Sequence, residues 1–354
     1  MTRDALLACL ARGEVIAGLT LTGVDLSQAD LSGAVFERVT FTKANLRQAV
    51  LRRATFEQCD LRGADCTGAE LAEAVLEGSQ LSGATLSQVK AKRAVLRKAD
   101  LTACQMAGAD LTEADLTEAR MERADCAGAV LAKAELAGAL VKGINFERAD
   151  LTKANLSGAD LHGCRFERTN LHKADLSQAS LEGLHLKGCL MALTRCAGAK
   201  AKRVVIEPGT VLTQASFIDA DLEGARLEGV TGWAAVFMGA KLAGATLAQS
   251  RLSQANFTGC DCATTDFTQA ELTQTRWKGA DCRGAKFVRA DLTYADLSHV
   301  NCGKTDFSHA VLDRTNLHRI QDGGAIWTGA NRAAARETDP DLQKAEDWPH
   351  QKIK

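Results

Sequence analysis

The chain has few of the residues that interrupt regular repeats, and it has no excess of either charge. Only 3 of its 354 residues are proline, and Pro208 alone precedes residue 340. Lys and Arg number 43 against 44 Asp and Glu, so no strongly basic or acidic surface is expected. No run of about 18 apolar residues occurs, as a membrane-spanning helix would require. We therefore expect neither a nucleic-acid partner nor a membrane span.

The first residues lack the apolar stretch of a signal peptide, because Met1 is followed directly by Thr2, Arg3 and Asp4. We expect a cytoplasmic protein, although secretion by a route that needs no such signal stays open. The 12 cysteines fit free thiols in a reducing compartment, because all but Cys9 fall on apolar positions of the repeat described below.

A five-residue rhythm runs through most of the chain. All 11 phenylalanines fall on one position of this pentad, in one register before residue 207 and in a second register, shifted by one, after residue 211. We call the position of the phenylalanines the centre of the pentad, and Leu fills most of the other centres. A small residue stands two positions before the centre, and Asp or Asn often stands directly before it. A period of five fits neither a helix nor a strand, and fixed repeats of this kind indicate a solenoid.

The pentads Ala29–Gly33, Ala109–Glu113 and Ala159–Gly163 read Ala, Asp, Leu and two variable residues. This pattern resembles the pentapeptide-repeat family over roughly residues 16–330. The resemblance implies an all-β solenoid, a right-handed quadrilateral parallel β-helix in which four pentads form one coil of 20 residues. The central and small residues would point inward. About 15 coils at ~4.8 Å would give a rod on the order of 70 Å long.

Residues 20 apart should then stack in columns, and the second register can be sorted in this way. The expected structural core consists of one column of Phe217, Phe237, Phe257 and Trp277, another of Phe267, Phe287 and Phe307 continued by Trp327, and a third of Cys262, Cys282 and Cys302. A disulfide or metal site on the cysteine column is the alternative to simple packing. Parallel side chains in a stack oppose the dihedral angle that a disulfide needs.

The sequence divides into an N-terminal helical cap at 1–15, a first repeat segment at 16–206, a register break at 207–211, a second segment at 212–330 and a tail at 331–354. At the break the central residues Ile206 and Leu212 are six apart. Pro208 and Gly209 between them indicate a bulge or loop. We treat these two residues as candidate interaction residues, with a tolerated insertion as the alternative.

The two ends each carry a helix signal. Thr2 can N-cap a helix over Arg3–Arg12 that stops at Gly13. This helix would cover the open end of the solenoid, and binding of a partner is the alternative. Near the other end, Asp339 and Pro340 begin a second short helix. This tail would cap the solenoid, pair two chains end to end as a homodimer, or be disordered. Trp348 within it is a candidate interaction residue.

One central position holds Gly232, which leaves a gap in the expected core. We expect the neighbouring Trp233 to fold inward and fill the gap; exposure of Trp233 for binding is the alternative. We therefore also keep Trp233 as a candidate interaction residue.

Catalytic, cofactor-binding and metal-binding residues are not expected. The seven histidines are scattered, and no set of nucleophile, base and orienting residue can be assembled from their spacing. His299 and His318 could meet on one face of adjacent coils, but two histidines are a weak metal signal. The glycines stand singly and form no phosphate-binding loop. We expect a protein that is not an enzyme.

Charge alternates in sign from coil to coil on one face, from Arg52 and Arg53 through Glu70 and Glu73 to Lys90. Such a surface pairs with itself. Some proteins of the family mimic DNA, bind DNA gyrase and protect it from quinolones, which requires a strongly acidic surface. The neutral composition disfavours that function here, and it stays the alternative.

The expected function is a non-catalytic scaffold or adaptor for an unidentified protein partner. Residues 6–14, leading into 26–31, are similar to pentapeptide-repeat proteins associated with bacterial type VI secretion. This resemblance implies an adaptor, cargo or effector of a secretion system.

Overall fold

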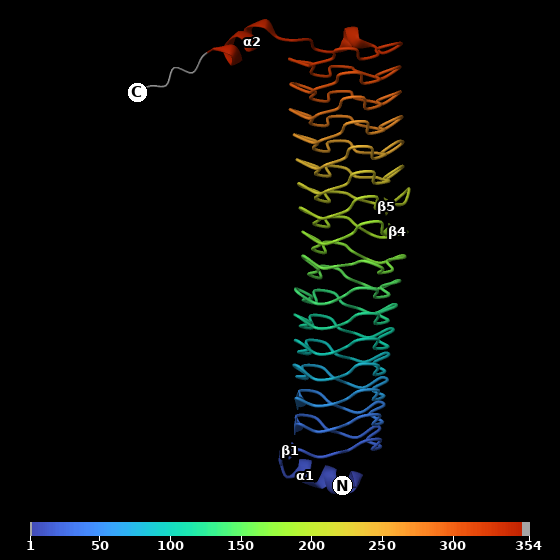
Figure 1. The fold of residues 1–354 in the computed structure, drawn as a ribbon, viewed down its shortest axis with the longest axis vertical. Helices are drawn as coiled ribbons and strands as arrows, with labels where there is room; N and C mark the ends of the chain where they lie inside the picture. Colours follow the sequence, from blue (N-terminus) through green and yellow to red (C-terminus); the bar gives the residue numbers. More distant parts are fainter. Residues whose placement is uncertain (1, 349–354) are drawn as a thin grey trace, which may run out of the picture. The chain divides into compact units, whose positions relative to one another are not determined.

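The computed structural model describes residues 2–348, and the chain divides into two compact units, Met1–Lys200 and Ala201–Lys354. Within each unit the backbone runs in coils that lie one above the next (Figure 1). Parallel bridges join residues 20 apart, such as Asp25 to Asn45 and Asn45 to Asp65 in the first unit. Val236 to Asn256 is an example in the second unit. Each 20-residue coil therefore stacks in register on the next.

Regular elements are short, because each straight segment ends at a turn after a few residues. The first unit contains α1 (Arg3–Ala11), β1 (Ile16–Ala17), β2 (Val35–Glu37), β3 (Thr55–Glu57) and β4 (His185–Leu186). The second contains β5 (Val205–Ile206), the 3₁₀ turn η1 (Arg332–Ala334) and α2 (Pro340–Asp347). β1, β2 and β3 form a parallel sheet in which Ile16 pairs with Phe36 and Phe36 with Phe56. Of these described helices, none is long and apolar enough to cross a membrane.

One pentad shows why the repeat is five residues long. The carbonyl of the central Leu26 accepts the N–H of Ala29 at 3.1 Å, which closes a tight turn. Gln28 in this turn has a left-handed φ of 57°, and glycine takes the same position in many other pentads. The N–H of Ser27 donates to the Asp25 carboxylate at 2.9 Å. Asp or Asn before the centre therefore stabilises the turn that follows it.

The small inward position often has a hydrogen-bonding role when it holds Ser, Thr or Cys. Thr169 Oγ1 donates to the carbonyl of Phe146, 23 residues earlier, at 2.7 Å. Cys104 Sγ does the same to Leu81 at 3.0 Å. A buried hydroxyl or thiol is tolerated there because this carbonyl satisfies it. Equivalent bonds come from Cys59, Ser79, Cys164, Cys189, Thr194, Cys260, Thr265, Thr305 and Thr315.

Aromatic rings fill the interior of both units. All 11 phenylalanines and Trp277 are at most 1% exposed. In the second unit the rings of Phe237 and Phe257 are 4.9 Å apart and tilted by only 3°. Trp277 stacks on Phe257 at 4.1 Å, and its indole N–H donates to Thr275 Oγ1 at 2.8 Å. The large apolar residue therefore enters the core without leaving a buried donor unpaired.

A second stack of rings runs beside the first. Phe267 lies 5.0 Å from Phe287, and Phe287 lies 5.1 Å from Phe307. The two stacks meet edge to face between Phe257 and Phe267, whose planes cross at 83°. Both geometries are favourable for aromatic rings and add to the free energy of burial. Cys262, Cys282 and Cys302 are fully buried in the same core, and the described cysteines are free thiols.

Helix α1 is one residue shorter than the sequence predicts. It ends at Ala11, because the N–H of Arg12 already bonds back to Cys9 and Gly13 takes a left-handed φ of 75°. Thr2 is the N-cap and accepts the N–H of Ala5. Leu6 is the fully buried residue of the helix. α1 therefore lies against the first coils through one leucine rather than through a wide apolar face.

The prediction for Trp233 is wrong. Its side chain does not fill the space at Gly232 but is 46% exposed. A Cβ atom at Gly232 would lie 2.8 Å from Cδ2 of Leu252 and 3.4 Å from Cβ of Leu212. The leucines of the neighbouring coils already occupy the volume, so no gap remains for an indole ring.

Replacing Phe257 by Ala should destabilise the second unit by about 3–5 kcal/mol, because the change removes a ring packed between two others. Replacing Arg97, an exposed cation of the first unit, by Ala should change stability by less than about 1 kcal/mol. Denaturant unfolding of both variants measures the difference. Equal losses would contradict the assignment of inward and outward positions.

Replacing Gly232 by Leu would restore the repeat pattern, yet it should destabilise the protein by about 1–3 kcal/mol through overpacking against Leu252. Trp233→Ala, one residue away, should change stability by less than about 0.5 kcal/mol because the ring lies outside. Thermal unfolding compares the two variants. A stabilised Gly232→Leu protein would show that the space is empty after all.

Candidate interaction surface

A column of alternating charges runs up one face of the first unit. Its members are 20 residues apart in the sequence: Arg53, Glu73, Arg93, Glu113 and Lys133. Arg53 Nε lies 2.8 Å from Glu73 Oε2, and Arg93 Nε lies 3.0 Å from Glu113 Oε2. Lys133 Nζ lies 2.8 Å from the other oxygen of Glu113. Each charge is therefore paired with the coil below, the coil above, or both.

The turn geometry produces this alignment. All five residues of the column occupy the left-handed turn position, with φ between 57° and 59°. Identical backbone geometry projects side chains of successive coils in the same direction, one strand spacing apart. A shorter column beside it joins Arg52 to Glu70 at 2.6 Å and Glu70 to Lys90 at 3.1 Å. The face is thus covered by ion pairs within the chain.

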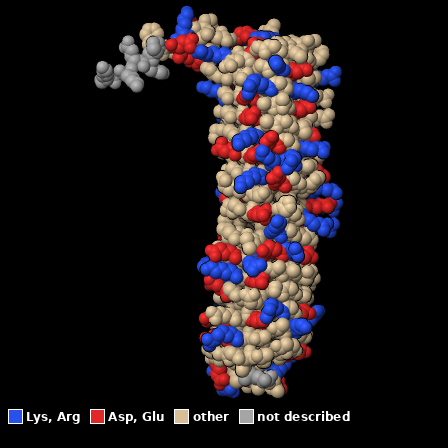
Figure 2. All heavy atoms as spheres, viewed as in Figure 1, with Lys and Arg blue, Asp and Glu red and all other residues tan. Residues whose placement is uncertain are grey.

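Two cations contact the carboxylate of Glu113 and lower its pKa. The hydrogen bond from Lys133 is the main cause, and that from Arg93 the next, of a pKa lowered from 4.5 to about 2. The carboxyl group stays ionised through the neutral range and well into acid. Acidic and basic side chains are interspersed in the same way over the face that Figure 2 shows.

The register break lies within the second unit. Val205 bridges to Arg226, 21 residues later, whereas bridges elsewhere join residues 20 apart. The extra residue is taken up in the turn at Pro208 and Gly209, both exposed, and Gly209 has a φ of 82°. Its N–H still donates to Gly229 at 2.9 Å. The inward pattern resumes at once, so the insertion forms a small outward bulge next to β5 (Figure 1).

Exposed apolar side chains accompany this bulge. Val211 is 39% exposed and bridges to Thr231 on the next coil, and Trp233 follows two residues later. Trp348, at the end of α2, is 73% exposed. The candidate interaction residues Pro208, Gly209, Trp233 and Trp348 are thus all at the surface. The first three lie on consecutive coils, and Trp348 lies apart from them at the end of the helix.

Burial keeps two of the core thiols in the protonated form. Burial raises the pKa of Cys66 and of Cys196 to about 12, so neither is a thiolate at neutral pH. Nucleophilic and metal-binding cysteines require the thiolate form and access to solvent. Eleven of the described cysteines are buried, and Cys9, on α1, is partly exposed. Within the stack of Cys262, Cys282 and Cys302, hydrogen bonds from the other two thiols lower the pKa of Cys282.

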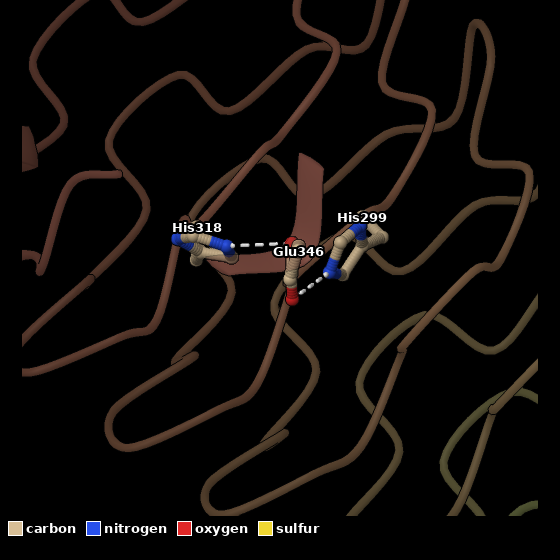
Figure 3. A group of neighbouring side chains, drawn as sticks. All are labelled: His299, His318 and Glu346. Atoms are coloured by element: carbon tan, nitrogen blue, oxygen red, sulfur yellow. Dashed lines mark hydrogen bonds and ion pairs between the residues drawn. The ribbon is translucent and has the colours of Figure 1, made fainter. Parts of the chain in front are cut away.

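A cluster that the sequence only half reveals lies at the C-terminal end of the second unit (Figure 3). His299 and His318 lie on adjacent coils, and Glu346 comes from α2. His299 Nε2 is 3.2 Å from Glu346 Oε1, and His318 Nε2 is 3.2 Å from Glu346 Oε2. The hydrogen bond from His318 is the main cause of a lowered pKa for Glu346.

The surroundings of the cluster fix the tautomer of His318. The backbone N–H of Asp339 donates to His318 Nδ1 at 3.2 Å, so that nitrogen carries no proton and Nε2–H faces Glu346. Arg319 Nη1 is 3.3 Å from Glu346 Oε2 and 2.7 Å from Asp347 Oδ1. These contacts hold α2 against the coils. His318 is only 3% exposed.

Sequence spacing places His299 and His318 on one face, but it does not supply Glu346. α2 is a polar helix whose described residues are all exposed, so it lacks the apolar face that usually predicts packing. The available signal was Asp339 as N-cap, which fixes where the helix begins.

Changing Glu113 to Gln should lower stability at neutral pH. A carboxyl group whose pKa is depressed on folding contributes stability above its ordinary pKa of 4.5, and this contribution is lost as the pH falls through about 2. The melting temperatures of wild type and variant should therefore converge on acidification. Measuring both between pH 7 and pH 2 tests this.

Glu118→Gln is the matched control, because its cation, Lys98, lies 4.0 Å away. Its effect should be smaller than that of Glu113→Gln, and added salt should reduce both effects. A difference between wild type and Glu113→Gln that does not change with pH would contradict the role assigned to the carboxylate.

Similarity to known proteins shows to which family the chain belongs. Among curated proteins, no sequence matches the chain. Of solved structures, HetL, a pentapeptide-repeat protein involved in heterocyst differentiation regulation from the cyanobacterium Nostoc sp. strain PCC 7120, is 23% identical. The match covers 96% of this chain and 98% of HetL, with a TM-score of 0.19.

Two further structures are similar to parts of the chain. The plasmid-mediated fluoroquinolone resistance protein QnrB1 is 18% identical over 76% of this chain and 91% of its own, with a TM-score of 0.17. A pentapeptide-repeat protein of the Arabidopsis thaliana thylakoid lumen is 27% identical over 35% of this chain and 66% of its own, with a TM-score of 0.12. Scores this low carry no argument about function.

The sequence profile "Pentapeptide repeats (8 copies)" matches most of the chain. The matched residues are 20–58, 49–88, 79–117, 109–147, 129–168, 208–231, 235–274, 265–301 and 290–321. The chain therefore belongs to the pentapeptide-repeat family.

Proposed function

We propose that this protein is a non-catalytic scaffold or adaptor that binds another protein through the outside of its coils. Family membership implies a right-handed β-helix. The coils of this chain are then its quadrilateral form, with α1 as the cap. One observation carries the proposal: bulky and reactive side chains are packed inward, while Val211 and Trp233 near the register break are exposed on the outside of the coils.

The recognition surface we propose lies at the register break. Trp233 and Val211 are exposed on consecutive coils, beside the outward bulge of Pro208 and Gly209. Tryptophan is enriched among the residues that dominate binding energy, and loops held by a rigid scaffold often carry binding residues. The charged columns of the first unit are already paired, so they offer less to a partner. Burying the exposed indole ring of Trp233 against a partner would contribute more binding free energy than covering those paired charges.

We further propose that the protein is an accessory or effector of a bacterial secretion system. This role rests on the similarity of residues 6–14 and 26–31 to proteins associated with bacterial type VI secretion. The protein would then bring a partner to the secretion machine or be carried by it.

The alternating columns argue against a DNA mimic that binds gyrase. DNA carries one negative charge per ~1.7 Å of helix axis, so a mimic needs rows of unpaired carboxylates. In this chain Glu73 and Glu113 are each flanked by cations of the neighbouring coils. The net charge of −1 leaves no excess to replace the phosphates.

The test compares partner capture by the full chain and by two variants. Trp233→Ala should weaken binding by at least about 2 kcal/mol, roughly 30-fold in Kd, at an unchanged melting temperature. Arg97→Ala, with its exposed cation on the first unit, should bind as wild type does. Undiminished binding by Trp233→Ala would remove the break from the proposal.

A gyrase supercoiling assay tests the other class of function directly. We expect no effect of the purified chain on supercoiling or on its inhibition by a quinolone. Stoichiometric inhibition or protection would replace the scaffold proposal by DNA mimicry.

A further inference from the structure

The ligand-type atoms of His299, His318 and Glu346 lie within 4.8 Å of one another. Both histidines present Nε2 to the same carboxylate, each at 3.2 Å. Zn²⁺ binds imidazole nitrogen at about 2.0–2.1 Å and carboxylate oxygen at about 2.0–2.2 Å, so neighbouring ligands on a tetrahedral ion are roughly 3.3 Å apart. The two nitrogen–oxygen pairs, one to each oxygen of the Glu346 carboxylate, are already close to this separation.

We propose that His299, His318 and Glu346 bind a divalent transition-metal ion, with Zn²⁺ as the best fit. Two imidazoles and one carboxylate suit Zn²⁺, whereas Ca²⁺ and Mg²⁺ prefer sets made of oxygen alone. Three protein ligands leave the fourth tetrahedral position to water or to a donor from outside the chain. The side chain of His299 is 31% exposed, so a metal ion can reach the site from solvent.

Binding requires one rearrangement at His318. In the metal-free form its proton sits on Nε2, because Nδ1 accepts the N–H of Asp339. The metal takes the Nε2 lone pair, and the proton moves to Nδ1, so the imidazole stays neutral. The bond from the Asp339 amide is then lost. The carboxylate of Asp339, which caps α2, would then be the acceptor for the Nδ1 proton.

The nearby cation must also give way. Arg319 contacts Glu346 at 3.3 Å and would compete with a metal for that carboxylate. Its bond to Asp347 is shorter, at 2.7 Å, so the guanidinium keeps a partner when the metal takes Glu346. Because Glu346 comes from α2 and the histidines from the coils, metal binding would fasten the helix to the last coils of the second unit. The ion would thus be a structural clasp with one open position.

The experiment titrates the metal-free full chain with Zn²⁺ in competition with a chromophoric chelator. One ion per chain should bind, and the melting temperature should rise as it does. Glu346→Gln and His299→Ala remove exposed or half-exposed ligands and should weaken binding by at least about 100-fold, more than the loss of an outer-shell partner typically does. The matched control is His309→Ala, an exposed histidine one half-coil away, which should bind as wild type does.

Two further measurements separate this site from other metal binding. Arg319→Gln removes the competing cation and should tighten binding. Co²⁺ should give the visible spectrum of a tetrahedral site with nitrogen and oxygen ligands. Absorption from thiolate ligation would place the ion on a cysteine and overturn the proposal. Equal affinities of wild type and Glu346→Gln, or equal losses in His299→Ala and His309→Ala, would also overturn it.

Discussion

The whole structure depends on one hydrogen-bonded turn repeated every five residues. The carbonyl of most central residues closes the turn by accepting the N–H three residues later, as Leu26 does from Ala29. A hydroxyl or thiol at the small position of the next coil often donates to the same carbonyl. Because one acceptor serves the turn and the stacking, the pentad and the coil have to stay in register together.

This constraint also arranges the surface. A turn residue with left-handed φ points outward at the same angle in each coil, so side chains 20 residues apart meet. Opposite charges at such positions pair without further design, as Arg53, Glu73 and Arg93 do. Single exposed pairs stabilise by at most about 1 kcal/mol. Their larger effect is to cancel the field of the face, which makes it a poor substitute for nucleic acid.

Sequence spacing could predict the interior because the physical signal is local and repeated. A phenylalanine on every fourth pentad predicts a stack of rings, and Phe237, Phe257 and Trp277 form one. The fate of Gly232 could not be predicted in this way. Whether its space is empty depends on how far Leu252 of the next coil reaches, which is a property of packing and not of period. The position of Glu346 beside the two histidines could not be predicted for a related reason, since the sequence of a polar helix has no pattern that shows where the helix packs.

Recognition is best sought where the repeat departs from its own rule. In the regular coils of the first unit many outward charges are paired with the coils above and below, as Arg53 and Glu73 are, so they offer less to another molecule. Near the bulge at Pro208, Trp233 stands at an outward position and is 46% exposed. At the C-terminal end, the same column geometry that pairs charges instead brings His299 and His318 together, and α2 supplies Glu346 across them. One turn rule therefore aligns both the paired charges of the first unit and the two histidines of the second.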